Sequence, residues 1–113
     1  MNNKSFKKLQ EKVLEWADDK DLLYEENAER QFVKFIEEVF EFKKEMDDKL
    51  RFAPCCIDIN NIKLEMGDIF VTLIILCEDL EIDPVVCLEM AYEKISKRTG
   101  KTINGTFVKE EDL

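Results

Sequence analysis

The chain reads EMGDIFVTLIILC from residue 65 to residue 77. A helix over this stretch is apolar on every side between residues 69 and 77, so it has to be surrounded by protein. The run is too short to cross a bilayer, which takes about 20 apolar residues. We therefore expect a helix over about residues 61–80 that is central to the fold, forms a subunit interface, or does both.

Three further helices are expected, two before this one in the sequence and one after it. Only three glycines and two prolines interrupt 113 residues, which favours long helices. Apolar residues at three- and four-residue steps predict helices over about residues 5–19 and 27–49. Asp83 as N-cap and Pro84 in the first helical position predict a fourth helix over about 84–98. The predicted fold is all-α, a single four-helix domain covering residues 1–113.

The ends of these helices leave two segments without helical periodicity. Residues 51–60 contain Pro54 and are predicted to form a loop. Residues 100–113 contain Asn104-Gly105, a pair typical of tight hairpin turns, and are predicted to form a short hairpin or an ordered arm.

Composition excludes several classes of function. A formal charge of −9 disfavours nucleic acid and anionic membranes as partners, because both attract basic surfaces. The chain has no histidine, which excludes Ser-His-Asp and Cys-His catalysis and histidine metal sites. Its four cysteines form no Cys-x-x-Cys pair, and no apolar signal region opens the chain. We expect a cytoplasmic protein with reduced thiols.

Two acidic pairs are the candidate metal ligands. Glu38 and Glu41 are three residues apart on the helix over 27–49, and Glu65 and Asp68 repeat that step on the helix over 61–80. Each pair therefore shares one side of its helix, and antiparallel packing brings four carboxylates together. Oxygen ligands without histidine suit Mg²⁺, with Mn²⁺ as a substitute.

The two pairs differ in how strongly the sequence argues against an ordinary solvated helix face. Glu38 and Glu41, like Glu37 beside them, could equally lie on an ordinary wet helix face. Glu65 and Asp68 directly precede the apolar run, where an unpaired carboxylate is costly. Gly67 between them lowers helix propensity by about 1 kcal/mol relative to alanine, which favours a close approach of backbone or ligand at that point.

Several other residues are candidate substrate contacts, each with a structural alternative. Lys34 lies one turn before Glu38 and either meets phosphate or forms an ion pair with Glu38. Lys94 and Arg98 belong to a basic run that either binds phosphate or complements the helix C-terminus. Trp16 either packs in the core or stacks on a base. Asn104 either serves the turn or reaches a partner's site.

These motifs together resemble one family. The pattern Glu38-x-x-Glu41, a 23-residue spacer and Glu65-x-x-Asp68 is similar to the signature of MazG-like, all-α nucleoside triphosphate pyrophosphohydrolases. QFVKFIEEVFEF and LEMGDIFVTLIILC resemble that family's second and third helix blocks, and the segment from Ala91 onward resembles small stand-alone bacterial and phage members. Many relatives have asparagine where Ala91 stands, which weakens the transfer of nucleotide contacts on that helix.

The resemblance implies a fold, a reaction and an assembly. It implies a MazG-like bundle completed by oligomerisation, as a homodimer or a dimer of dimers. It implies that Glu38, Glu41, Glu65 and Asp68 bind Mg²⁺, and that a (deoxy)nucleoside triphosphate is hydrolysed to the monophosphate and pyrophosphate. Glu37 or Glu38 is our candidate for orienting the attacking water. The alternatives are a non-catalytic helical interaction protein and a nucleotide-binding regulator.

Overall fold

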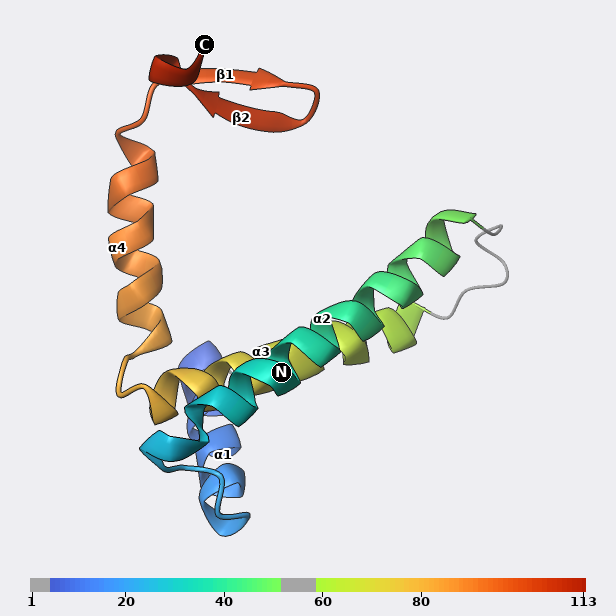
Figure 1. Ribbon diagram of the computed structural model, residues 1–113, viewed down its shortest axis with the longest axis vertical. Helices are drawn as coiled ribbons and strands as arrows, with labels where there is room; N and C mark the ends of the chain where they lie inside the picture. The colour runs from blue at the N-terminus through green and yellow to red at the C-terminus, as the bar shows by residue number, and fades with distance from the viewer. Residues whose placement is uncertain (1–4, 52–58) are drawn as a thin grey trace. The chain divides into compact units, whose positions relative to one another are not determined.

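The computed structural model of the 113-residue chain describes residues 5–51 and 59–113 (Figure 1). The described residues form four α-helices and one two-stranded hairpin, so the all-α prediction is confirmed. Of the loop predicted over residues 51–60, residues 52–58, with Pro54, Cys55 and Cys56, lie outside the described residues, whereas residue 51 ends α2 and residues 59 and 60 begin α3. The elements are α1 (Phe6–Asp19), η1 (Glu25–Asn27), α2 (Ala28–Arg51), α3 (Ile59–Asp79), α4 (Pro84–Ser96), β1 (Gly100–Ile103), β2 (Thr106–Lys109) and η3 (Glu110–Asp112).

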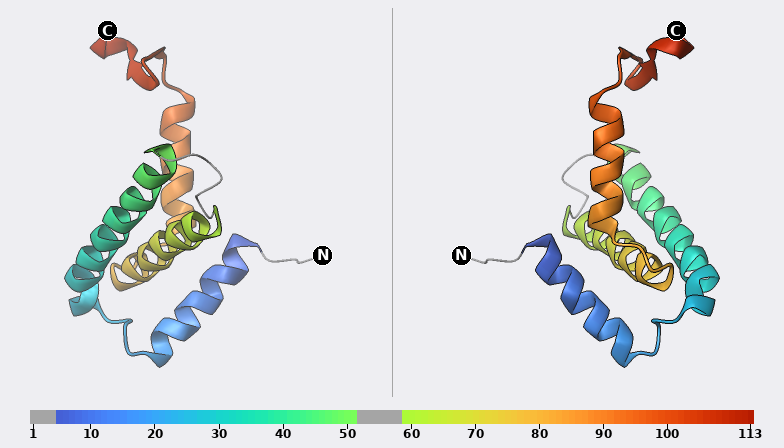
Figure 2. Two further views of the ribbon diagram at one scale, coloured as in Figure 1. Left: turned by 90° about the vertical axis from the view of Figure 1, so that its right-hand side faces the viewer. Right: turned by 90° about the vertical axis from the view of Figure 1, so that its left-hand side faces the viewer.

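The chain divides into two compact units, Met1–Ile82 and Asp83–Leu113. In the first unit α2 and α3 run antiparallel side by side, and α1 packs against α3 (Figures 1 and 2). This antiparallel pairing is the arrangement that the two acidic motifs require. The buried hydrophobic side chains of the described residues are Ala17, Ile74, Ile75 and Cys77.

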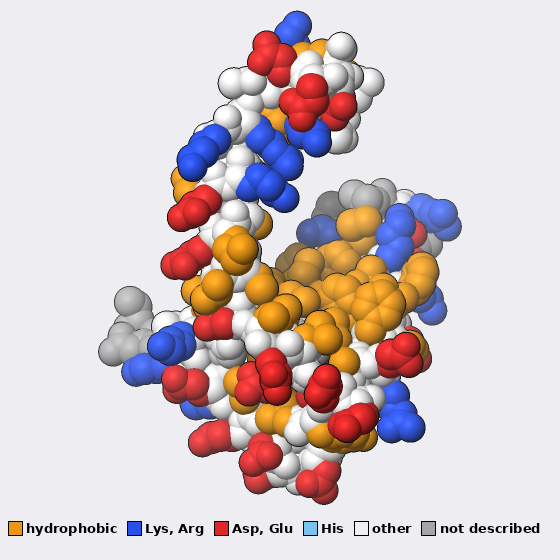
Figure 3. All heavy atoms as spheres, turned by 60° about the vertical axis from the view of Figure 1, so that its left-hand side comes forward, with side chains coloured by type: hydrophobic (Ala, Val, Ile, Leu, Met, Phe, Trp, Pro, Cys, Tyr) orange, Lys and Arg blue, Asp and Glu red, His pale blue; other side chains and the backbone are white. Residues whose placement is uncertain are grey.

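The apolar run of α3 is only partly enclosed by the described residues. Ile74 and Ile75 are buried, whereas Phe70 stays 45% exposed and touches the Phe6 ring of α1 edge-on. Exposed apolar side chains also follow α2 and the first half of α3, among them Phe40 and Leu64. Figure 3 shows hydrophobic side chains gathered over a broad area of this face.

The connector between α1 and α2, residues 20–27, is held by hydrogen bonds at several points. Asp21 takes a left-handed conformation with φ of 58°, and the next amide, that of Leu22, donates to the Ala17 carbonyl at 3.0 Å. This closes α1 with the bond pattern of a Schellman motif. The Asn27 side-chain amide then donates to the Leu22 carbonyl at 3.0 Å. The connector is therefore a shaped segment that returns the chain toward α3.

The second unit confirms the local signals read from the sequence. The Asp83 carboxylate accepts a hydrogen bond from the Val85 amide at 2.9 Å and caps α4, which begins at Pro84. Asn104 and Gly105 take φ values of 50° and 80°, as a type I′ turn requires, and they join β1 to β2. Gly100 is obligatory, because an added Cβ would lie 2.1 Å from the Val108 carbonyl oxygen. The hairpin alternative for residues 100–113 is thus the observed one.

The remaining features of this unit are its exposed helix and its basic end. α4 has no buried side chain in the structure. Basic side chains gather where α4 meets the hairpin (Figure 3). Among the helices of residues 5–51 and 59–113, none combines the length and hydrophobicity that crossing a bilayer demands.

Candidate metal centre

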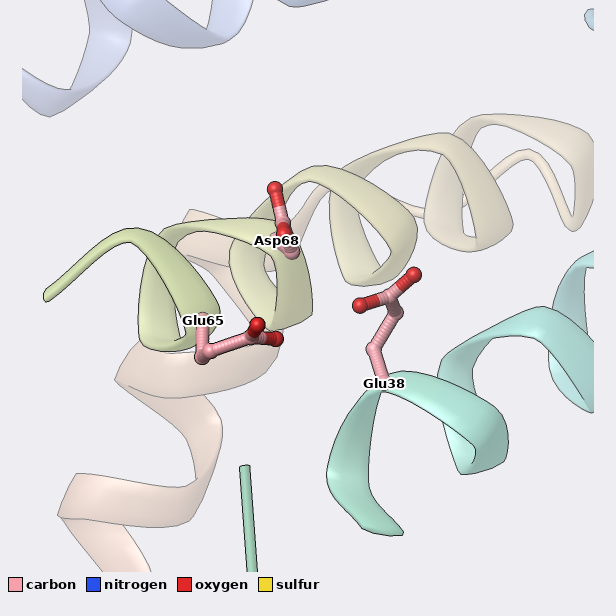
Figure 4. A group of neighbouring side chains, drawn as sticks. All are labelled: Glu38, Glu65 and Asp68. Carbon is pink, nitrogen blue, oxygen red and sulfur yellow. The ribbon is translucent and has the colours of Figure 1, made fainter. Parts of the chain in front are cut away.

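Three carboxylates from two helices converge in the first unit. Glu38 of α2 and Glu65 and Asp68 of α3 each place one oxygen so that all three oxygens lie within 4.8 Å of one another. Figure 4 shows Glu38 and Glu65 reaching into the space between the helices, with Asp68 beside them. Antiparallel packing of α2 and α3 produces this meeting, because the two motifs lie on facing sides of the pair.

The buried members of this cluster carry oxygens that the protein does not satisfy. Glu38 is only 7% exposed, and its Oε2 has no hydrogen-bond partner among the described residues. The Oε2 of half-buried Glu65 is buried without a partner as well. Buried polar atoms are nearly always paired in folded proteins, so two unpartnered carboxylate oxygens in one place make this cluster a candidate cation site.

The electrostatics of the cluster point the same way. Burial raises the pKa of Glu65, and the negative charges of Glu41, Asp68 and Glu38 raise it further. A carboxyl in this setting is destabilised as an anion until positive charge arrives. Asp68 is exposed, so the cluster is open to solvent on its side. A hard divalent cation such as Mg²⁺ fits the all-oxygen donor set and compensates its charge.

Lys34 supplies positive charge from α2. Its Nζ lies 3.2 Å from Glu38 Oε1 and 3.8 Å from Glu37 Oε2. The hydrogen bond and the charge of Glu38 raise the pKa of Lys34. The ion pair that was one alternative for Lys34 is therefore present, and it engages Oε1 of Glu38 while Oε2 has no hydrogen-bond partner among the described residues.

Glu41 and Glu37 are placed differently from Glu38. Glu41 is exposed and supplies no oxygen to the cluster of three, although its charge contributes to the raised pKa of Glu65. Glu37 is exposed and turned toward Lys34. Only one acid of the α2 motif is thus buried in the site.

A cavity of about 500 Å³ extends from the cluster. Pockets of 300–1,000 Å³ hold small organic ligands. Trp16 of α1, Lys34 and Glu38 of α2, and Asp68 of α3 all line it, so the packing of three helices brings four of the predicted residues to one place. The other lining residues are Leu22, Asn27, Arg30, Gln31, Val71, Thr72 and Ile75.

Sequence reasoning missed a polar row on η1 and α2 that forms one wall of this cavity. Asn27, Gln31, Lys34 and Glu38 follow one another at steps of four, three and four residues, which places them along one helix face. Three of them, all but Lys34, are buried. The same 4-3-4 pattern of polar residues was readable in the sequence and would have identified this wall.

The surroundings of Gly67 test the backbone half of one expectation. An added Cβ there meets nothing within 4 Å, so no described backbone approaches Gly67 closely. Instead this face of α3 is open, with a shallow cavity lined by Gly67, Asp68 and Leu64 among others.

The other predicted substrate contacts belong to the second unit. Arg98 lines a separate cavity of about 610 Å³ together with Tyr92, Ile95, Ser96 and Phe107. Asn104 occupies the hairpin turn, which is the structural role predicted as its alternative. Lys94 is an exposed residue in the last turn of α4.

Comparison of the chain with family models, with curated proteins and with solved structures gives no match.

Proposed function

We propose that this protein is a Mg²⁺-dependent hydrolase that converts a (deoxy)nucleoside triphosphate into the monophosphate and pyrophosphate. The observation that supports it is the meeting of the Glu38, Glu65 and Asp68 oxygens within 4.8 Å at the edge of a cavity that Lys34 and Trp16 also line. The resemblance of these motifs to MazG-like enzymes supplies the reaction. An acidic protein binds a polyanion readily once a cation lies between them.

In this proposal Glu38, Glu65 and Asp68 hold the ion, and Glu41 joins them from the next turn of α2. Bound magnesium neutralises phosphate charge and lowers the pKa of a coordinated water. Glu38 is better placed than Glu37 to orient the attacking water, because Glu38 is buried at the carboxylate cluster whereas Glu37 is exposed and turned toward Lys34. Water adds to the α-phosphorus, the bond to the bridging oxygen breaks, and pyrophosphate leaves.

Other contacts complete the proposed substrate site. Lys34 donates to phosphate oxygens from its place beside Glu38, stabilising charge by position. Trp16, half exposed at the cavity, offers a stacking face to the base. Lys94, Arg98 and Asn104 stay substrate contacts predicted from the sequence alone.

We further propose that the protein works as a homodimer or a dimer of dimers. The support is the small buried core and the large exposed apolar side chains along α2 and α3, such as Phe40 at 69% and Leu64 at 68%. Soluble monomers rarely leave contiguous apolar area of this kind uncovered. Association would also enclose the open face beside Gly67.

A product assay tests the proposed reaction. The purified protein is incubated with a panel of canonical and modified (d)NTPs and Mg²⁺, and the products are separated by ion-exchange chromatography. We expect monophosphate and pyrophosphate, lost on chelation and in Glu38→Gln, with Glu11→Gln on α1 as the control for removal of one negative charge. Glu37→Gln, run beside them, should retain activity if Glu38 orients the water.

The other outcomes separate the alternatives. Tight nucleotide binding without turnover would favour a regulator that keeps the site. Neither binding nor turnover with any nucleotide would refute the proposal and favour an interaction protein. Orthophosphate as product would mean that a different bond is cleaved.

A further inference from the structure

Asp79 is a buried acid at the opposite end of α3 from the metal ligands. It is the last residue of the helix and only 2% exposed. Its Oδ1 accepts a hydrogen bond from the Tyr24 backbone amide at 3.0 Å, across 55 residues of sequence. Its Oδ2 is buried and has no partner among the described residues. Burial raises the pKa of this carboxyl, the Tyr24 hydrogen bond opposes that rise, and nearby Glu78 adds to it.

Asp79 is too distant to act on the metal site itself. It lies on the same face of α3 as Asp68, Thr72 and Ile75, at steps of four, three and four residues. Eleven residues of helix separate it from Asp68, which is about 16 Å at 1.5 Å per residue. Asp79 does not line the cavity, and its hydrogen bond to Tyr24 links it to a segment that does.

That segment is the connector of residues 20–27, which forms part of the cavity wall. Leu22 and Asn27 line the cavity and are joined by the hydrogen bond from the Asn27 side chain to the Leu22 carbonyl. Tyr24 lies between them in sequence and carries the bond to Asp79. Its hydroxyl also accepts a long, 3.5 Å hydrogen bond from Arg30, another lining residue. One anchor on α3 thus holds the connector at its middle.

We propose that Asp79 is a positioning residue that holds the 20–27 connector in place as the wall of the nucleotide cavity remote from the carboxylates. The inference rests on the proposed function, in which the triphosphate lies at Glu38, Glu65 and Asp68. The connector wall then meets the nucleoside part of the substrate, and Asp79 governs substrate affinity without taking part in phosphate cleavage. A buried carboxylate with one unsatisfied oxygen destabilises the fold, and a role in positioning this wall accounts for its presence.

Two variants of Asp79 separate this role from general stability. Asp79→Ala removes the acceptor, whereas Asp79→Asn keeps an oxygen that can accept from the Tyr24 amide. Two controls accompany them: Glu78→Gln removes the neighbouring exposed charge, and Tyr24→Phe removes only the hydroxyl contact to Arg30. For each protein, amide hydrogen exchange is measured by NMR, and KM and kcat are measured with the best nucleotide of the panel.

In Asp79→Ala we expect exchange at the connector amides to rise about tenfold to a hundredfold, the range for losing a hydrogen bond to a charged group. Exchange in the middle of α3 should not change. KM should rise about tenfold while kcat stays within about twofold of the wild type, because the carboxylates are untouched. In Asp79→Asn both the connector exchange and KM should return most of the way to the wild-type values. Glu78→Gln should resemble the wild type.

Several results would overturn the inference. Unchanged connector exchange in Asp79→Ala would do so, and so would faster connector exchange with unchanged KM. Equal loss of protection throughout α2 and α3, or failure of Asp79→Ala to fold, would show a role in the whole fold rather than in this wall. If the wild type turns over no nucleotide, the proposed reaction fails separately, and the exchange pattern alone decides whether Asp79 holds the connector.

Discussion

Replacing Glu65 by glutamine should change stability in opposite directions without and with magnesium. Without metal, burial and then the charges of Glu41, Asp68 and Glu38 disfavour the ionised form of Glu65 and raise its pKa. Glutamine has nearly the same shape and no charge, so the metal-free variant should melt at a higher temperature than the wild type. With metal, the same change removes one of the proposed carboxylate ligands, and the variant should lose most of the stabilisation that magnesium gives.

The size of the magnesium effect follows from linkage. At a metal concentration one hundred times Kd, binding to the native state adds about 2.7 kcal/mol. At about 4 °C per kcal/mol for a chain of this size, the wild-type Tm should rise by about 10 °C. If the loss of one carboxylate weakens binding about a hundredfold, the gain at the same concentration falls to about 0.4 kcal/mol, or about 2 °C.

Thermal unfolding followed by circular dichroism, with EDTA and with a Mg²⁺ titration, measures both effects. Glu11→Gln, an exposed change on α1, controls for the reduced net charge of the whole protein. A Glu65→Gln variant that melts below the wild type in EDTA would contradict the electrostatic reasoning. An unchanged magnesium-dependent rise in Tm would remove Glu65 from the metal site.

The pH dependence gives a further check on this variant. A carboxyl whose folded pKa is raised above its ordinary value of 4.5 contributes stability that is complete below that value and is lost as the pH rises through the folded pKa. The metal-free advantage of Glu65→Gln should therefore appear as the pH rises above about 4.5 and vanish below it. Magnesium affinity of the wild type should increase over the same pH window, since the ligand must be deprotonated.

Three other changes test separate parts of the structure. Asp79→Asn should gain stability relative to the wild type as the pH rises above 3.8, because the pKa of Asp79 is raised in the folded protein. Urea unfolding across pH 4–8 measures this difference in stability, and a difference that stays constant with pH would contradict the raised pKa. Lys34→Gln should raise KM about tenfold and keep the magnesium-dependent Tm increase, because Lys34 meets phosphate rather than metal; an abolished Tm increase would show that it orders Glu38 instead. Gly67→Ala should stabilise the metal-free protein by about 1 kcal/mol, since nothing lies within 4 Å of the added carbon; destabilisation in urea would reveal a close neighbour from another copy.

The sequence by itself determined the elements of the fold, because their signals act over a few residues. Asp83 and Pro84 begin α4 as predicted, through a side-chain cap and a fixed φ. Asn104-Gly105 makes the hairpin turn, because these residues tolerate positive φ. The sequence also singled out Glu65 and Asp68, since acids beside an apolar run are conspicuous without any knowledge of packing.

Only the tertiary structure decided which acids of α2 are buried and which are exposed. Glu38 and Glu41 are about 60° apart around the helix, so the rotation of α2 against α3 determines which of them is buried, and no local pattern encodes that rotation. The structure buries Glu38 and leaves Glu41 and Glu37 exposed. The hydrogen bond between Asp79 and Tyr24 joins residues 55 positions apart, and no local pattern encodes it either. Such contacts depend on how whole helices pack. Helix packing is set by the sum of many weak apolar interactions, so it cannot be read from the few polar residues that it brings together.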